Sequence, residues 1–115
     1  MSRRILKVNE LLKREISKVL EEELPESWGI VTVMSCEASA DLKEATCWLS
    51  FLEKEKSDKF ERDLDLLASK IQKIINSRLK LKYVPRLTFK IDHSLKQALR
   101  IEELLAKIKK EKSKK

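Results

Sequence analysis

Residues 57–91 constrain the fold more than any other part of the chain. Apolar side chains recur at helical spacing over residues 57–81, which predicts a long amphipathic helix. Pro85 blocks further helix, and the residues after it alternate between apolar and polar, as in a half-buried strand. A strand that follows a helical crossover can pair in parallel with its neighbour, so this stretch predicts a mixed sheet. The apolar positions are Phe60, Leu64, Leu67, Ile71, Ile75 and Leu79 in the helix, and Leu87, Phe89 and Ile91 in the strand.

The residues before this stretch predict one helix and a β-hairpin. Residues 3–23 carry an apolar stripe at helical spacing, and residues 30–36 and 45–51 form two strands around a turn at 39–43. Val31 and Val33 stand at odd positions and Cys36 at an even one, so a regular strand would direct Cys36 to the opposite face. This pattern indicates a β-bulge in the first strand. The predicted inward side chains of the second strand are Ala45, Cys47, Leu49 and Phe51.

The last part of the chain predicts another helix and a basic tail. Ser94 and Gln97 form a capping box that opens a helix through about residue 110. The order helix, strand, strand, long helix, strand, helix predicts an α+β domain, with helices on one face of a three-stranded mixed sheet. We expect a single domain over residues 1–106 and a disordered tail over residues 107–115, which hold six lysines and one glutamate.

Composition excludes several classes of function. Gly29 is the only glycine, so no glycine-rich phosphate loop can be written, and most nucleotide-dependent enzymes are excluded. His93 is the only histidine, so no zinc-type ligand set exists, and we expect neither metal nor cofactor. Cys36 and Cys47 flank the hairpin turn, and the geometry of a hairpin allows a disulfide between them. In a reducing compartment, however, two buried thiols are favoured. Without a membrane-length apolar run or a signal peptide, the protein is expected in the cytoplasm.

The charges of the chain are segregated. The net charge is +7, residues 66–91 contain no acid, and residues 53–65 hold six acids against four bases. A positive electrostatic field confined to one element favours a polyanionic partner. The alternative is that these lysines only form a solvated face of the helix. Trp48, on the polar face of the second strand, has two readings: a stacking platform for a base, or a cover for the open sheet.

Charges at both ends of the first predicted helix oppose its dipole. Arg3, Arg4 and Lys7 lie in its first turns, and residues 21–23, all glutamates, crowd its last turn. Packing must therefore stabilise this helix, and its basic end is available for another role.

Several segments, at their spacing and in their order, resemble the ribosome-binding factor A family over about residues 4–104. These segments are Val31–Val33, Glu37–Leu42 (EASADL), Ala45–Leu52 (ATCWLSFL), and Leu67–Asp92 followed by Ser94. The resemblance implies a KH-like fold of the second type, α-β-β-α-β, with a broken second helix. It also implies a non-enzymatic assembly factor that binds the immature small (30S) ribosomal subunit and its 16S rRNA, assists maturation of that RNA, and is linked with adaptation to cold.

The family's Ala-x-Gly break in the second helix corresponds to Ala68-Ser69-Lys70, with lysine in place of the usual glycine. Small residues in the middle of so long a helix also favour a kink there. We therefore expect the kink at these three residues, with the charge of Lys70 directed at RNA.

The leading hypothesis is a monomeric, non-catalytic protein that binds RNA phosphates, with neighbouring ribosomal proteins as further partners. The alternative is a protein-interaction module whose basic charge serves solubility, without direct RNA contact. An enzyme is least favoured, because His93 and the two cysteines form no nucleophilic set. The expected RNA contacts are Lys70, Lys73, Arg78, Lys80, Lys82 and Arg86, extended by Arg3, Arg4 and Lys7 if the first helix packs beside the second.

Overall fold

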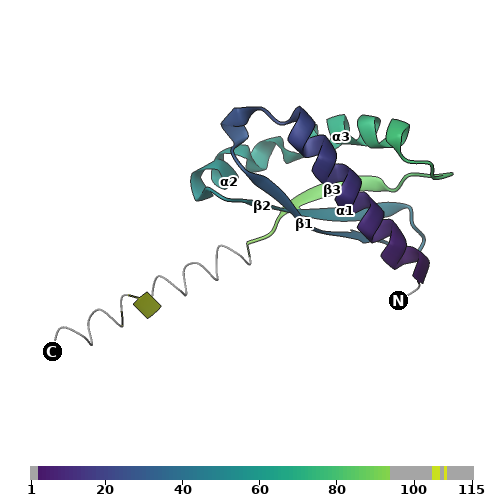
Figure 1. Cartoon of the computed structure of the whole chain (residues 1–115), viewed down its shortest axis with the longest axis horizontal. Coiled ribbons are helices and arrows are strands. Elements are labelled where there is room, and N and C mark those ends of the chain that lie inside the picture. Colours follow the sequence, from purple (N-terminus) through teal and green to yellow (C-terminus); the bar gives the residue numbers. More distant parts are fainter. Residues whose placement is uncertain (1–2, 94–104, 107, 109–115) are drawn as a thin grey trace.

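The computed structural model describes residues 3–93, 105–106 and 108 (Figure 1). The predicted capping box at Ser94 and almost all of the last helix and of the basic tail lie outside these residues. The helices are α1 (Arg3–Glu23), α2 (Lys54–Phe60) and α3 (Leu64–Arg78), and the strands are β1 (Val31–Ala38), β2 (Glu44–Phe51) and β3 (Arg86–Ile91). Single 3₁₀ turns, η1 (Glu26–Trp28) and η2 (Glu61–Asp63), lie between them.

The sheet has the predicted mixed topology. Its strand order is β1-β2-β3, with β1 antiparallel and β3 parallel to β2. Helix α1 packs on β1, α3 packs on β3, and the two helices contact each other. Figure 1 shows α1 lying across the strands, with α3 next to it. The α+β architecture with a three-stranded mixed sheet is therefore confirmed.

One core lies between the helices and the inward face of the sheet. The predicted faces are correct, because the inward residues of β2 and β3 are all buried and lie in register: Ala45 pairs with Leu87, Cys47 with Phe89, and Leu49 with Ile91. The helices contribute the buried side chains Val8, Leu12, Ile16, Val19 and Leu20 from α1, and Leu64, Leu67, Ala68, Ile71 and Ile75 from α3.

The predicted bulge in β1 is confirmed. The register with β2 shifts between Val33, which pairs with Leu49, and Ser35, which pairs with Trp48. Strand side chains normally alternate between faces, so residues three apart would point in opposite directions. The extra residue, Met34, allows both Val33 and Cys36 to be buried in the core.

The cysteines are free, buried thiols, in agreement with the favoured interpretation. Cys36 and Cys47 are direct partners across the strands, and their sulfur atoms lie 3.2 Å apart. The neighbouring Cys36 thiol and burial both raise the pKa of Cys47 far above its usual range. Both residues are buried among apolar side chains and act as small members of the core.

The expected position of the helix break was wrong. The structure interrupts the helix at Glu61–Asp63, while residues 68–70 lie within the continuous α-helix α3. Lysine at position 70 is a good helix former without glycine's freedom at positive φ, so the local sequence does not favour a break there. Instead the break follows Phe60, whose ring stacks on Trp28 with 4.1 Å between centroids. This contact fixes the end of α2 against the rest of the domain.

The second helix also ends earlier than predicted. Leu79 is extended, with ψ of 133°, and its side chain is buried. Lys80 and Lys82 therefore lie in the loop between α3 and β3 and not on the helix.

Carboxamide side chains of the two main helices hold the edge strands. The Ala38 N–H of β1 donates to Asn9 Oδ1 at 2.8 Å. At the other edge, the Leu87 N–H donates to Gln72 Oε1 at 2.7 Å, and Gln72 Nε2 donates to the Pro85 carbonyl at 3.1 Å. Each helix is thereby fixed along the sheet as well as packed onto it.

We expect Gln72→Met to destabilise the fold by about 1–3 kcal/mol, because it leaves a half-buried N–H and a carbonyl without partners. Methionine keeps the length and helix propensity of the side chain, so the loss is confined to hydrogen bonding. Urea denaturation gives the free energy of unfolding. The matched control is Lys73→Met at the neighbouring exposed position, which should change stability by no more than about 0.5 kcal/mol. Equal stabilities of the two variants would contradict the role of Gln72.

Candidate nucleic-acid interface

All nine basic side chains predicted to contact RNA are exposed, but they lie on four elements. Three begin α1, three lie on α3, two lie in the loop over residues 79–85, and one begins β3. In this order they are Arg3, Arg4 and Lys7; Lys70, Lys73 and Arg78; Lys80 and Lys82; and Arg86.

Two of the basic residues on α3 are paired with carboxylates of α1. Lys70 Nζ lies 3.6 Å from Glu23 Oε2, and the Arg78 guanidinium donates to Glu22 Oε2. The hydrogen bond from Arg78 lowers the pKa of Glu22, and the same bond raises the pKa of Arg78. These contacts explain the glutamates that oppose the dipole of α1, because α3 provides their counter-charges. Lys70 and Arg78 therefore join the helices and are partly neutralised.

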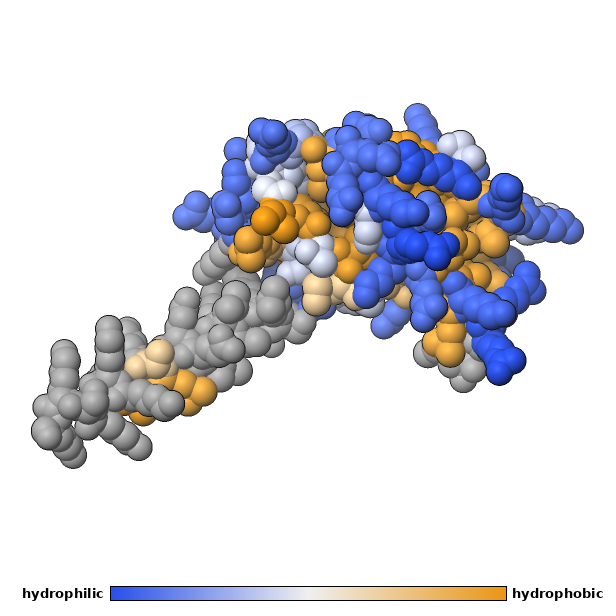
Figure 2. All heavy atoms as spheres, in the orientation of Figure 1, coloured by the Kyte–Doolittle hydropathy of each residue, from blue (hydrophilic) through white to orange (hydrophobic). Residues whose placement is uncertain are grey.

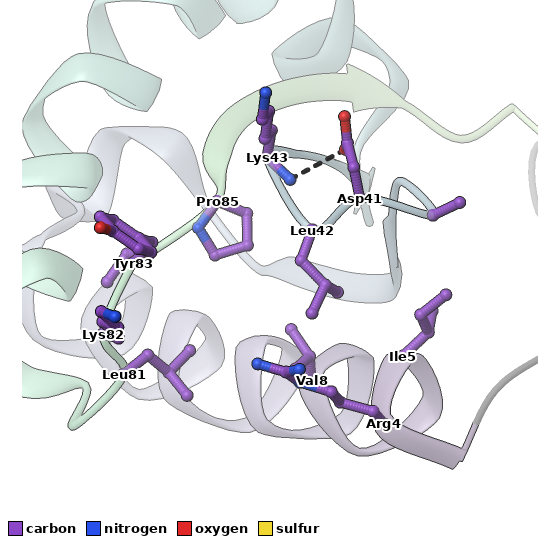
Figure 3. A pocket seen from close by; sticks show the side chains of 12 residues that line it. Arg4, Ile5, Val8, Asp41, Leu42, Lys43, Leu81, Lys82, Tyr83 and Pro85 are labelled. Carbon is purple, nitrogen blue, oxygen red and sulfur yellow. Dashed lines mark hydrogen bonds between the residues drawn. The ribbon is translucent and has the colours of Figure 1, made fainter.

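The start of α1, the β1–β2 turn and the α3–β3 loop meet at one end of the molecule and enclose a hollow of about 630 Å³ (Figure 3). Each segment brings a cation to it: Arg4 from α1, Lys43 from the turn and Lys82 from the loop. Figure 2 shows hydrophilic side chains around hydrophobic surface at this end, where the N-terminus lies. The apolar lining comes from Ile5, Val8, Leu42, Leu81, Val84 and Pro85.

Side-chain hydrogen bonds fix the turn that borders the hollow. Asp41 Oδ1 accepts from Ser39 Oγ at 2.6 Å and from the Lys43 N–H at 3.1 Å. The bond from Ser39 is the main cause of the lowered pKa of Asp41, followed by the bond from Lys43. Leu42, between them, has a φ of 60°, a conformation that leucine rarely adopts. Figure 3 shows its side chain directed toward α1.

Sequence reasoning missed Lys43 and Leu42 as parts of a site. Asp41 is explained by the preference of aspartate for turns, but no local pattern in the sequence indicates which other segments the turn will approach. That information lies in the pairing of β3 with β2, which places the loop beside the turn. The Arg86 N–H at the start of β3 donates to the Lys43 carbonyl at 2.9 Å.

A second, shallower groove runs between α3 and β3. Ala68, Ser69 and Gln72 line one side of it, and Arg86 and Thr88 line the other, with a volume of about 420 Å³. Arg86 thus lies beside the helix segment where the kink was expected. Asp65 also lines this groove, so its charge is mixed.

Trp48 lies half-buried on the outward face of the sheet, opposite Lys90 of β3. The Lys90 Nζ is 5.6 Å from the centre of the Trp48 ring, within the range of a cation–π contact. The ring is therefore partly covered by Lys90 and partly open. This position is compatible with a stacking platform for a base and with a cover for the open face of the sheet.

No group of three or more histidine, cysteine, aspartate or glutamate side chains in the described part of the chain is placed to hold a metal ion. Among the same residues, no helix combines the length and the apolar character needed to cross a bilayer.

We expect Arg78→Gln to raise the pKa of Glu22 toward its ordinary value of 4.5, because the main cause of its depression is removed. A depressed carboxyl pKa means that the pair stabilises the fold fully above about pH 4.5 and loses this contribution as the pH falls further. Carboxyl ¹³C chemical shifts followed by NMR over a pH series give the value for each variant. Lys73→Gln removes an equal charge from α3 and should leave the Glu22 titration in place. An unchanged pKa in Arg78→Gln would contradict the pair.

Comparison with known proteins assigns this fold and sequence to a family. The family model for ribosome-binding factor A matches residues 4–105. Among similar proteins, ribosome-binding factor A of Akkermansia muciniphila is 36% identical over 110 residues, covering 96% of this chain and 88% of that protein. The protein of the same name from Halothermothrix orenii is 37% identical over 111 residues, covering 94% and 90%.

Solved structures agree on the fold. The crystal structure of ribosome-binding factor A from Thermus thermophilus matches with a TM-score of 0.65 and 17% identity, covering 76% of this chain and 94% of that one. A homology model of the Thermus thermophilus protein, fitted into a cryo-electron microscopy map of its complex with the 30S subunit, matches with a TM-score of 0.62 and 18% identity, covering 74% and 91%. The fold is KH-like, and the chain belongs to the ribosome-binding factor A family.

Proposed function

We propose that this protein is a non-catalytic ribosome assembly factor of the cytoplasm, which binds the immature 30S subunit through 16S rRNA and assists maturation of that RNA. The observation that carries the proposal is the family match over residues 4–105, nearly the whole chain. The complex of the Thermus thermophilus protein with the 30S subunit supports the choice of partner. The net charge of +7 suits a polyanion.

The main contact surface in this proposal is the basic end, which we define as Arg3, Arg4, Lys7, Lys43, Lys80 and Lys82. Figure 1 shows the three segments that carry these residues at the same end of the molecule. Within the residues that the structure describes, none of the six forms an ion pair, in contrast with Lys70 and Arg78. Unpaired cations release counterions from RNA without first breaking a bond inside the protein. Lys73 and Arg86 extend the contact along α3 and β3, and Lys70 and Arg78 contribute less.

Phosphate contacts fix position and supply affinity, but they carry little sequence information. Specificity in this proposal comes from the folded shape of the immature rRNA, and from ribosomal proteins beside it. Assistance in maturation then follows from binding one assembly state better than another, because a ligand shifts an equilibrium only by its differential affinity. A monomer suffices for this role, including the adaptation to cold that the family resemblance implies.

We expect the triple variant Arg4→Gln, Lys80→Gln, Lys82→Gln to bind immature 30S particles more weakly and with a shallower salt dependence. Each lost phosphate contact lowers the slope of log affinity against log salt by about 0.7–0.9, so loss of three contacts should lower it by about two to three. The matched control, Lys13→Gln, Lys59→Gln, Arg62→Gln, removes three exposed charges away from the basic end and should keep the slope. Binding that is indifferent to salt and to nuclease treatment would instead favour a protein-interaction module with solubilising charge.

A second expectation concerns the state of the ribosome. Since the proposal requires preference for the immature particle, the protein should co-sediment with free small subunits and not with translating ribosomes. Sucrose-gradient fractionation of cell extract, followed by detection of the protein in each fraction, provides the measurement. Equal amounts in both fractions would exclude an assembly role.

A further inference from the structure

The hollow at the basic end is built differently from a simple charged surface. Its volume of about 630 Å³ lies in the range of sites for small molecules, about 300–1,000 Å³. Of the apolar residues that line it, Val8 and Pro85 are buried, but Ile5, Leu42 and Leu81 are only half-buried. Apolar side chains therefore remain open to the space between the three segments. Phosphate contacts alone do not require such a lining.

Leu42 is held in this lining at an energetic cost. A leucine with φ of 60° is strained, and glycine or asparagine would adopt this turn conformation more readily. The hydrogen bonds of Asp41 keep the turn closed around it, and Leu42 packs against the core. The backbone thus presents an apolar side chain where a polar turn residue would be less strained.

The rim of the hollow combines cations with an exposed aromatic ring. Tyr83 is 78% exposed, and the Lys82 Nζ lies 5.7 Å from the centre of its ring. Figure 3 shows the Arg4 guanidinium extending from α1 toward the loop that carries Leu81 and Lys82. The carboxylate of Asp41 lies on the turn side, so an anion is favoured on the side of Arg4 and Lys82.

An apolar slot, two cations on one side and an exposed aromatic ring match the parts of one nucleotide. We infer that the hollow receives a single unstacked nucleotide of RNA, with its base between Leu42 and Leu81, its phosphate on Arg4 and Lys82, and Tyr83 stacked at the entrance. A paired base cannot enter, so the ligand is a nucleotide from a single-stranded segment, a loop or a bulge. This inference rests on the proposed function and adds base recognition to the phosphate contacts of that surface.

Mononucleotides test the hollow directly. Amide NMR spectra of the full chain are recorded during titration with each of the four nucleoside 5′-monophosphates, with ribose 5-phosphate, and with inorganic phosphate. We expect the nucleotides to shift the amides of residues 41–43 and 81–84, and at least one of them to bind about fivefold or more tightly than ribose 5-phosphate. Equal affinity of ribose 5-phosphate and all four nucleotides would overturn the inference, because the base would then contribute nothing.

Variants of Tyr83 separate stacking from charge. Tyr83→Ala should weaken nucleotide binding about fivefold or more, and Tyr83→Phe should retain it, because phenylalanine keeps the ring. Since the residue is exposed, neither change should alter the unfolding midpoint by much. Leu42→Asn tests the lining: asparagine tolerates the positive φ, so the turn is kept while the apolar wall is lost. Retention of nucleotide affinity in both Tyr83→Ala and Leu42→Asn would overturn the inference.

Binding to immature 30S particles distinguishes this inference from the proposed function. Tyr83→Ala should weaken particle binding without changing the salt slope, because no charge is removed. If Tyr83→Ala binds particles like the unmodified protein while the Arg4, Lys80 and Lys82 triple variant is defective, the basic end binds RNA but the hollow takes no base. If Tyr83→Ala weakens binding equally to nuclease-treated particles, the hollow receives a protein side chain, and the inference fails. If neither variant affects particle binding, the proposed surface fails as well.

Discussion

The parallel pairing of β3 with β2 is the constraint on which the rest of the structure depends. It begins at the first residue of β3, where the Arg86 N–H donates to the Lys43 carbonyl at 2.9 Å. Parallel neighbours require a crossover, and α2 and α3 provide it along the inward face. The loop that follows α3 must then reach the turn between β1 and β2. The core, the basic end and the hollow are all consequences of this one register.

The electrostatics of the molecule are divided between the two ends of α1. Both ends oppose the helix dipole, so α1 depends on its buried face for stability. At its C-terminal end, Glu22 and Glu23 recover favourable contacts from Arg78 and Lys70 of α3. At its N-terminal end, Arg4 forms no comparable pair among the described residues, and it lies beside the hollow. The basic residues at this end interact unfavourably with the helix dipole, which is consistent with a binding role there.

Much of the fold could be predicted from the sequence, because the spacing of the apolar residues specifies which face of each helix and strand is buried. The bulge could be predicted for the same reason, since Val33 and Cys36 are three residues apart and a regular strand would direct them to opposite faces. The helix break could not be predicted correctly, because it follows Phe60, whose stacking on Trp28 is a contact between distant segments. The candidate site was predicted only as a set of charges. The pairing of Lys70 and Arg78 with α1, and the part played by Lys43, depend on tertiary contacts that no local pattern encodes.

The carboxamides of Asn9 and Gln72 have a consequence for association between chains. A three-stranded sheet has two edges, and an unoccupied edge can template further strands from another molecule. Here the Ala38 N–H at one edge, and the Leu87 N–H and Pro85 carbonyl at the other, are already bonded to helix side chains. A second copy cannot add a strand at these points without displacing a helix contact. The same bonds that orient α1 and α3 therefore block strand addition at these positions of the two edges.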